Sequence, residues 1–368
     1  MDDRFLSLAR PCVREMEAYH PGLPMDEVRR IAGREDILRL SANESSEAPS
    51  AAVLAAMQEA LLEVNRYPDS SGKAIREQLS QREHLPADWF LLGNGLDDVL
   101  YLLGLTFLNP GDEVVIPALT FPVYEGVAKM MDAIPVPVGM RGDFSTDSQG
   151  LLEAVTPRTK MLFLCNPNNP TGTMTTRAEF EALMSQLPSH VIVVLDEAYR
   201  DFVTDGDYPS GRDYLAMYPN LIVLWTFSKI YGLAGLRLGC AVGHPELLAL
   251  MNRIRPPYTV NSIAQAAVLA ALKDEERITE ARNRNACVRQ QLCRCLEDLN
   301  VVYIPSHANF VFIRPGGAVQ EIAMRLMEKG ILVRSLSHQG INNGLRLSIG
   351  TERENEYLMK TLRVTLCR

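Results

Sequence analysis

Short apolar runs alternate with amphipathic stretches through the middle of the chain. Runs rich in valine, isoleucine and leucine occur at residues 113–116, 160–165, 191–195 and 221–225. They are nearly continuously apolar, which is typical of strands buried on both faces of a sheet. Residues 177–187, between two of these runs, have the apolar spacing of a helix. Strands that alternate with helices predict an α/β fold with a mainly parallel sheet covered by helices.

The last third of the chain has a different pattern. A long helical stretch at residues 262–298 is followed by a helical pattern at 317–329. Three short strand patterns lie around the second helix, at residues 309–313, 331–333 and 345–349. This arrangement predicts a second, smaller α+β domain.

The chain length fits two domains. Its 368 residues exceed what one hydrophobic core usually supports. We expect a large domain at residues 46–260, which begins with an amphipathic helix at 50–65. We expect the small domain to combine residues 261–368 with the N-terminal segment 1–45.

Composition excludes several classes of function. Hydrophobic residues make up 47% of the chain, charged residues 22%, and the net charge is −8. An acidic balance without a basic stripe argues against a nucleic-acid partner. There is no apolar run of about eighteen residues, so no membrane span is predicted. The N-terminus lacks the apolar core of a signal peptide, and we expect a cytoplasmic protein.

The cysteines predict neither disulfides nor a metal site. Seven cysteines are scattered along the chain, and an odd number indicates reduced thiols. Cys293 and Cys295 form a C-x-C pair, but no histidine pair at zinc-binding spacing accompanies it. We therefore predict no metal ligands.

Three polar motifs follow directly after predicted strands. The string Asn-Pro-Asn-Asn-Pro-Thr-Gly occupies residues 166–172, after the run 160–165. Asp196 ends the run 191–195, and Lys229 follows the run 221–225. Because open α/β sheets bind ligands at the carboxyl ends of their strands, we expect these motifs to converge.

Each of these residues has an ordinary structural interpretation when taken alone. Lys229 would be a surface charge, Asp196 a helix N-cap, and the asparagine-proline string a turn. Together they supply the groups that pyridoxal phosphate requires: an amine for a Schiff base, a carboxylate for the pyridine nitrogen and donors for the ring oxygen. Arg237, eight residues after Lys229, could bind the phosphate through its planar fork.

A glycine-containing loop adds a second phosphate contact. Gly-Asn-Gly at residues 93–95 opens a predicted helix, whose free backbone N–H groups would bind a phosphate. The loop is not G-x-G-x-x-G, which argues against a dinucleotide site.

With these motifs the chain resembles the class I and II aminotransferases of the fold-type I pyridoxal phosphate family. The resemblance covers nearly the whole chain and includes further strings at residues 19–22, 40–44, 66–68, 120–121, 308–310, 330–334 and 345–350. Within the family the chain is most similar to the histidinol-phosphate aminotransferases. The resemblance implies a large domain with a mainly parallel central sheet and a smaller α+β domain.

The resemblance also implies roles around the cofactor ring. Lys229 would form the internal aldimine and carry the proton between Cα and C4′. Asp196 would pair with the ring nitrogen. Asn169 and Tyr199 would bind the ring oxygen O3′, and Phe121 would stack on the ring face.

Further roles concern the phosphate and the substrate. The phosphate would be held by backbone or side-chain groups of five residues: Leu96, Asp97, Thr226, Ser228 and Arg237. Tyr67 would reach that phosphate from the other subunit of a homodimer. Arg346 would bind the anionic group of the substrate, assisted by Arg334, and Tyr19 would close over it.

The chain departs from the family in two places. Relatives usually continue Asn-Glu with Asn-Pro, whereas here Ser45, Ser46 and Glu47 follow. If Glu47 points into the site, its charge would disfavour an anionic substrate group. Leu96 stands where relatives more often have a small residue, but its backbone N–H would still serve the phosphate.

The resemblance implies transamination between L-histidinol phosphate and 2-oxoglutarate. The altered loop leaves an aromatic or other amino-acid aminotransferase of the same subgroup as an alternative. A threonine-phosphate-type decarboxylase would use the same cofactor residues but release carbon dioxide without a keto acid. A cofactor-sensing regulator would need a DNA-binding segment, and the N-terminal region is not basic enough for one.

Overall fold

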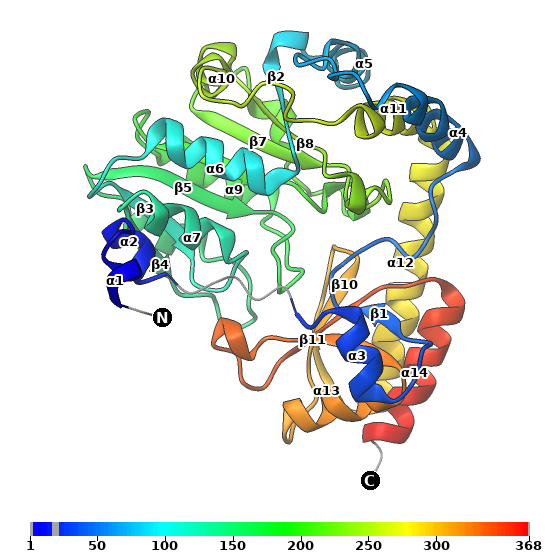
Figure 1. The fold of residues 1–368 in the computed structure, drawn as a ribbon. Helices are drawn as coiled ribbons and strands as arrows, with labels where there is room; N and C mark the ends of the chain where they lie inside the picture. The colour runs from blue at the N-terminus through cyan, green and yellow to red at the C-terminus, as the bar shows by residue number, and fades with distance from the viewer. Residues whose placement is uncertain (1–2, 17–21, 367–368) are drawn as a thin grey trace.

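Two β-sheets with surrounding helices form the fold (Figure 1). The computed structural model describes residues 3–16 and 22–366. Within these residues the larger sheet has seven strands and the smaller sheet has five. The N-terminal helix α2 (Pro11–Arg14), which follows α1 (Asp3–Leu6), packs against α7 (Val123–Met130) beside the larger sheet (Figure 1).

The larger sheet is mainly parallel, as predicted. Its strand order is β2-β8-β7-β6-β5-β3-β4, and β8 is antiparallel to both of its neighbours while the other pairs are parallel. The strands are β2 (Phe90–Gly93), β3 (Glu113–Pro117), β4 (Ile134–Val138), β5 (Thr159–Cys165), β6 (Ile192–Asp196), β7 (Leu221–Thr226) and β8 (Gly239–Gly243).

The sheet is apolar throughout because both of its faces are covered. Alternate residues of each strand point to opposite faces. On β6, Val194 joins a core shared with α6 (Leu96–Phe107), α7 and α10 (Pro245–Asn252), whereas Val193 and Leu195 join the core on the other face. That second core contains residues of α4 (Ala51–Ala60), α5 (Lys73–Glu83), α8 (Ser148–Glu153), α9 (Arg177–Gln186) and α11 (Ser262–Ala271).

The hydrophobic pattern of the sequence did not predict strand β4. Its sequence, Ile-Pro-Val-Pro-Val, contains Pro135 and Pro137, which lack a backbone N–H for the ladder. The strand lies at the edge of the sheet, where it has β3 as its one neighbour. An edge position tolerates proline because one side of the strand makes no ladder bonds.

The smaller sheet joins the two ends of the chain. Its order is β1-β11-β12-β10-β9, with β1 (Leu38–Leu40), β9 (Val302–Ile304), β10 (Phe310–Arg314), β11 (Ile331–Ser335) and β12 (Leu345–Ser348). Strand β1 pairs in parallel with β11. The helices around it are α3 (Met25–Ala32), α12 (Glu275–Asp298), α13 (Val319–Glu328) and α14 (Glu352–Leu366). The predicted α+β character of this part is confirmed.

The predicted helical stretch 262–298 is two helices. Helix α11 ends at Ala271 and α12 begins at Glu275, where the side chain of Asp274 accepts a hydrogen bond from the backbone of Arg277 and so caps the second helix. Helix α11 packs against α4, and its buried residues Ala264 and Val268 belong to the core of the larger sheet. The domain boundary at residue 260 stays a prediction.

Short 3₁₀ helices complete the fold. They are η1 (Leu61–Glu63), η2 (Ala87–Trp89), η3 (Arg200–Phe202), η4 (Gly211–Tyr214), η5 (Ala234–Leu236) and η6 (Ser337–Gln339). In the part of the chain that the structure describes, none of the helices has the length and apolar character needed to cross a membrane.

Candidate active site

A cavity of about 580 Å³ lies between the carboxyl end of the larger sheet and the smaller sheet. Twelve of the residues predicted from the sequence line it: Leu96, Asp97, Phe121, Asn169, Asp196, Tyr199, Thr226, Ser228, Lys229, Arg237, Arg334 and Arg346. The N-terminal segment contributes further lining residues, among them Arg39, Asn43 and Glu44. A cavity of this size that is walled by convergent polar groups is suited to a small-molecule ligand.

Lys229 presents an amine in this cavity. It lies three residues after the end of β7, and its Nζ donates a hydrogen bond to the backbone oxygen of Ala42 at 3.2 Å. Burial, followed by the positive charges of Arg346 and Arg237, lowers the pKa of Lys229 to about 8. About a tenth of the amine is therefore unprotonated at pH 7, far more than for an exposed lysine, and this form can act as a nucleophile.

Asp196 presents a buried carboxylate beside the lysine. It is the last residue of β6, and its side chain is 3% exposed. Its Oδ2 accepts from the hydroxyl of Tyr124 at 2.7 Å, and its Oδ1 accepts from the backbone N–H of Ala198 at 2.9 Å. Burial raises the pKa of Asp196, while these two hydrogen bonds oppose that rise. Both donors are neutral, so the carboxylate can still accept a cationic partner from the cavity.

Tyr199 stands on the turn after β6. Its hydroxyl accepts a hydrogen bond from Nδ2 of Asn43 at 3.1 Å, and its ring meets Phe310 edge-on at 5.1 Å. Burial raises the pKa of Tyr199 above its usual range, so the phenol stays protonated. The backbone of Asn43 donates in turn to Oγ of Ser348 on β12. The N-terminal segment thus fixes the tyrosine against the smaller sheet.

Asn169 and Arg346 contact each other across the cavity. Nη1 of Arg346, on β12, donates to Oδ1 of Asn169 at 2.5 Å, and Nη2 donates to the backbone oxygen of Ser41 at 2.7 Å. The arginine is 7% exposed. Both acceptors are neutral oxygens, so these two bonds orient the guanidinium without compensating its charge.

The loop that carries Asn169 is held by its own hydrogen bonds. The side chain of Asn166 donates to the backbone oxygen of Thr175 at 3.0 Å and accepts from its N–H at 2.9 Å. The side chain of Asn168 accepts from Thr120 at 2.8 Å and donates to Thr171 at 3.0 Å. These contacts close the segment 166–175 on itself, so Asn169 projects from a fixed turn.

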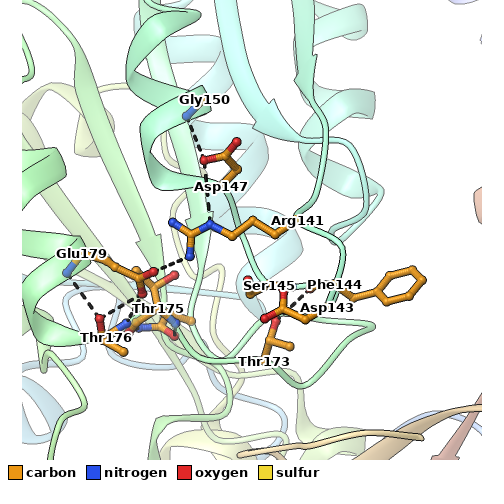
Figure 2. A network of polar contacts seen from close by, with 11 residues as sticks. Arg141, Asp143, Phe144, Ser145, Asp147, Gly150, Thr173, Thr175, Thr176 and Glu179 are labelled. Carbon is orange, nitrogen blue, oxygen red and sulfur yellow. Dashed lines mark hydrogen bonds and ion pairs between the residues drawn. The ribbon is translucent and has the colours of Figure 1, made fainter. Parts of the chain in front are cut away.

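A polar network braces the same loop from outside (Figure 2). Arg141 forms an ion pair with Glu179 in the first turn of α9, and Glu179 makes a capping box with Thr176. Oγ1 of Thr173 donates to the backbone oxygen of Phe144 at 3.2 Å. Residues 141–147 therefore support the loop beside the cavity.

The opposite wall has the features of a phosphate site. The first backbone N–H groups of α6, from Leu96 on, have no partner within the helix and favour an anion. Arg237 approaches from the other side and donates to Oγ of Ser228 at 3.4 Å. A Cβ added to Gly95, which has a φ of +83°, would lie 2.4 Å from Nη2 of Arg237. The glycine is needed for this close approach.

Two predicted residues are not among the lining groups. Tyr67 is 81% exposed and stacks on Tyr258, with the ring centres 4.5 Å apart. Its predicted reach into the site of another subunit stays a prediction. Tyr19 lies outside the described residues.

Glu47 does not point into the cavity, so the condition for its predicted effect on an anionic substrate is not met. Its carboxylate pairs with Arg284 at 2.5 Å and lies 3.9 Å from Arg277, both on α12. It is not among the residues that line the cavity. Glu44 does line it and is paired with Arg39 at 3.3 Å. The altered loop therefore adds no unpaired negative charge at Glu47 to the site.

Sequence reasoning missed three residues of the site. Tyr124 binds Asp196, Asn43 binds Tyr199, and Cys165 lines the cavity opposite Asp196 in the register of β5 and β6. Tyr124 follows Phe121 by three residues at the start of a helix, a spacing that places both on one side. That spacing was the available signal for Tyr124.

Comparison with known proteins identifies the family of the chain. Residues 35–362 match the family described as "Aminotransferase class I and II". The chain is 40% identical to a histidinol-phosphate aminotransferase of Moorella thermoacetica, over 97% of this chain and 92% of that protein. It is also 40% identical to the histidinol-phosphate aminotransferase of Symbiobacterium thermophilum, over 98% of this chain and 99% of that protein.

Solved structures of similar fold match nearly the whole chain. The histidinol-phosphate aminotransferase of Sinorhizobium meliloti in complex with pyridoxal-5'-phosphate superimposes with a TM-score of 0.90 at 28% identity, and 98% of each chain is covered. Aspartate aminotransferase of Thermus thermophilus with maleate has a TM-score of 0.82 at 24% identity, over 97% of this chain and 99% of that chain. This second likeness concerns the fold alone.

Proposed function

Since the chain belongs to the family of class I and II aminotransferases, we propose that it is a pyridoxal-phosphate-dependent enzyme that exchanges the amino group of L-histidinol phosphate with 2-oxoglutarate. One observation carries the proposal. The amine of Lys229 and the carboxylate of Asp196, from the ends of adjacent strands, line one cavity together with the N-terminus of α6 and Arg237.

The residues present fit pyridoxal phosphate. The neutral surroundings of the Asp196 carboxylate leave its charge for a protonated ring nitrogen. Arg237 lies so close to Gly95 that a Cβ added to Gly95 would be 2.4 Å from Nη2 of the arginine. The guanidinium therefore lies next to the backbone N–H groups at the start of α6, and the two together suit a phosphate. When bound, the cofactor supplies an aldehyde that condenses with amines and a ring that withdraws electrons from the bonds of the carbon that carries the amine.

The residues of the chain then have distinct tasks. Lys229, with its lowered pKa, would hold the aldehyde carbon of the cofactor and would move a proton at the amino carbon of the substrate. Asp196 keeps the ring nitrogen protonated. Tyr199 and Asn169, which line the cavity, would bind the ring oxygen, and Phe121 would cover the ring face.

The phosphate of the cofactor has its own set of contacts. The backbone of Leu96 and Asp97, together with Thr226, Ser228 and Arg237, lines the cavity and would bind it. The hydroxyl of Thr226 also accepts from the backbone N–H of Ser228 at 3.1 Å, which shapes the turn before Lys229. Thr226, Ser228 and Lys229 on this turn all line the cavity.

The substrate is held by positive charge from the smaller sheet. Arg346 on β12 and Arg334 on β11 both line the cavity, and paired strands bring them into register. Two guanidinium groups suit a phosphate ester or a dicarboxylic acid, the anionic groups of the two proposed substrates.

We also propose a cytoplasmic homodimer. The stacked pair Tyr67 and Tyr258 is exposed, and Leu61, Leu62 and Val64 expose apolar side chains nearby in the sequence. Apolar surface of this kind favours association, and it supports a second subunit that receives Tyr67. Six described cysteines are free, which fits a reducing compartment.

The test is a single-donor panel with the purified protein loaded with pyridoxal phosphate. Histidinol phosphate, phenylalanine, tyrosine, glutamate and threonine phosphate are each added while the visible spectrum is recorded. Conversion to pyridoxamine phosphate by histidinol phosphate and by glutamate, with no response to the aromatic donors, supports the proposal. Conversion by the aromatic donors instead would replace it with the aromatic alternative, and carbon dioxide release from threonine phosphate would replace it with the decarboxylase.

Lys229→Ala provides the control for this panel. Borohydride should fix the cofactor to the wild-type protein and not to the variant, because Lys229 is the only lysine among the described residues that line the cavity. A variant that retained both the fixed cofactor and full turnover would show that Lys229 is not the reacting amine.

A further inference from the structure

Tyr124 contacts the carboxylate of Asp196. Its hydroxyl donates to Oδ2 of Asp196 at 2.7 Å. The side chain is fully buried, and its ring stacks on Phe163 of β5 with the centres 4.6 Å apart and the planes 3° from parallel. The position of the hydroxyl is therefore fixed by packing rather than by the hydrogen bond alone.

The same short segment also carries Phe121. The backbone N–H of Tyr124 donates to the oxygen of Phe121 at 3.2 Å, and the two rings meet edge-on at 5.7 Å. Phe121 lines the cavity, whereas Tyr124 lies behind it against Asp196. The segment at the start of α7 thus positions two groups at once: the ring of Phe121 in the cavity and, through Tyr124, the carboxylate of Asp196.

A buried carboxylate opposite a pyridine nitrogen shares one proton with it. The proton can lie on the nitrogen, which gives an ion pair, or on the carboxyl, which gives two neutral groups. Burial favours the neutral arrangement because it penalises charge. A hydrogen bond donated to the carboxylate oxygen favours the ion pair, because it stabilises the charged form of the acid.

Tyr124 can donate this bond at every pH at which the enzyme would work. Burial and the neighbouring charge of Asp196 raise the pKa of the Tyr124 hydroxyl well above its usual range, so it stays protonated. The N–H of Ala198 binds the other oxygen and is a permanent donor. The carboxylate therefore has a donor on each oxygen.

We propose, on the basis of the function proposed above, that Tyr124 is a positioning residue that keeps the shared proton on the ring nitrogen of the cofactor rather than on Asp196. The ring withdraws electrons strongly when its nitrogen is protonated. A residue that touches neither the substrate nor the cofactor thereby sets the electronic state of the cofactor through the carboxylate.

Tyr124→Phe is the test, because it removes the hydroxyl and keeps the ring that stacks on Phe163. Two readouts are used: the ¹⁵N chemical shift of pyridoxal phosphate labelled at the ring nitrogen, and the dissociation constant of the cofactor. The shift should move from the protonated toward the unprotonated pyridine position. The dissociation constant should rise about tenfold to a hundredfold, as expected for a lost hydrogen bond to a charged group.

An analogue with carbon in place of the ring nitrogen separates this role from a merely structural one. The variant should bind the analogue nearly as well as the wild-type protein does, because no proton is shared there. Equal losses of affinity for cofactor and analogue, or an unchanged ¹⁵N shift, would overturn the role of Tyr124.

Tyr214→Phe is the matched control. Tyr214 is also buried, packs its ring on Phe180 and donates to a carboxylate, that of Glu181 at 2.7 Å, but does not line the cavity. It should leave the shift and both dissociation constants unchanged. A wild-type protein that fails to bind pyridoxal phosphate would instead overturn the proposed function, and the role of Tyr124 with it.

Discussion

Nη1 of Arg346 donates a hydrogen bond to Oδ1 of Asn169 and so joins the smaller sheet to the loop after β5 of the larger sheet. The same guanidinium donates to the backbone oxygen of Ser41, which precedes the segment that contacts Lys229 and Tyr199. One side chain therefore ties together the three parts of the chain that enclose the cavity. In the proposed function the same guanidinium binds the anionic group of the substrate.

Arg346→Ala should weaken the binding of anionic substrates while the cofactor stays bound. The expected rise in the Michaelis constant for histidinol phosphate is about tenfold to a hundredfold, the effect of a lost charge-assisted hydrogen bond. Arg346→Lys should fall between the two, because it keeps the charge and loses the planar fork.

Steady-state kinetics and a cofactor titration measure the two effects separately. Arg325→Ala, on the surface of α13, removes an arginine that pairs with Glu321 outside the cavity and should change neither quantity. Unchanged Michaelis constants for every anionic substrate in Arg346→Ala would rule out this role.

The lowered pKa of Lys229 predicts a pH-dependent stability of the cofactor-free protein. The folded-state pKa is about 8, below the ordinary value of 10.5. Between these two values the unfolded chain binds more protons than the folded one, so this group makes stability rise with pH in that window. Below about pH 8 the buried charge destabilises the fold fully.

Lys229→Met removes this effect while it keeps an unbranched side chain. The variant should be more stable than the wild type below pH 8, and its advantage should shrink as the pH approaches 10.5. Urea unfolding of both cofactor-free proteins at several pH values measures the difference. Lys73→Met, at a lysine whose side chain is 72% exposed, should show no such trend. A constant difference across the window would contradict the lowered pKa.

Gly95→Ala should damage the phosphate site more than the fold. The new Cβ would lie 2.4 Å from Nη2 of Arg237, so the guanidinium must move away from the helix N-terminus. We expect the dissociation constant of pyridoxal phosphate to rise about tenfold or more, because a charge-assisted contact is lost.

Gly111→Ala is a close control for backbone strain. Gly111 has a φ of +86°, near the +83° of Gly95, and a Cβ added there would meet nothing within 4 Å. Both variants should lose about 1 kcal/mol of stability from the positive φ. Only Gly95→Ala should lose cofactor affinity, and equal affinities in the two variants would argue against a phosphate at this helix.

Asp196, Asn169 and Lys229 could be singled out because polar residues there follow strands that are otherwise apolar, whereas most of the other site residues were implied by the family resemblance. Asp196 is the clearest case, since a carboxylate that closes a fully buried run requires a partner. Asn169 follows β5 and Lys229 follows β7, the strands on either side of β6, and parallel pairing brings such positions to one edge. The parallel core of the fold could be predicted for the same reason, because strands buried on both faces read as continuous apolar runs.

The residues that were missed act across long separations in sequence. Tyr124 meets Asp196 at a distance of 72 positions and Asn43 meets Tyr199 at 156. Such contacts depend on the packing of whole elements, which no local pattern encodes. The direction of Glu47 could not be predicted for the same reason, because its carboxylate is held by Arg284 on the distant helix α12.

The network around Arg141 offers a last prediction, about the order of the loop that carries Asn169 (Figure 2). Arg141 and Glu179 have side chains that are 38% and 29% exposed, so their ion pair stabilises the protein by less than about 1 kcal/mol. Its larger effect should be local. Glu179 caps α9 through Thr176, and the preceding segment holds Asn166 through the backbone of Thr175.

Arg141→Ala should therefore leave the unfolding midpoint nearly unchanged and speed amide hydrogen exchange in residues 166–176 several-fold. Arg158→Ala is the control, because it breaks a different ion pair, the one with Glu113 at the start of β3. It should speed amide exchange near β3 but not in residues 166–176. Exchange mass spectrometry on both variants and the wild type distinguishes the two regions. If exchange in residues 166–176 were the same in all three proteins, the internal hydrogen bonds of Asn166 and Asn168 would suffice to hold Asn169 in place.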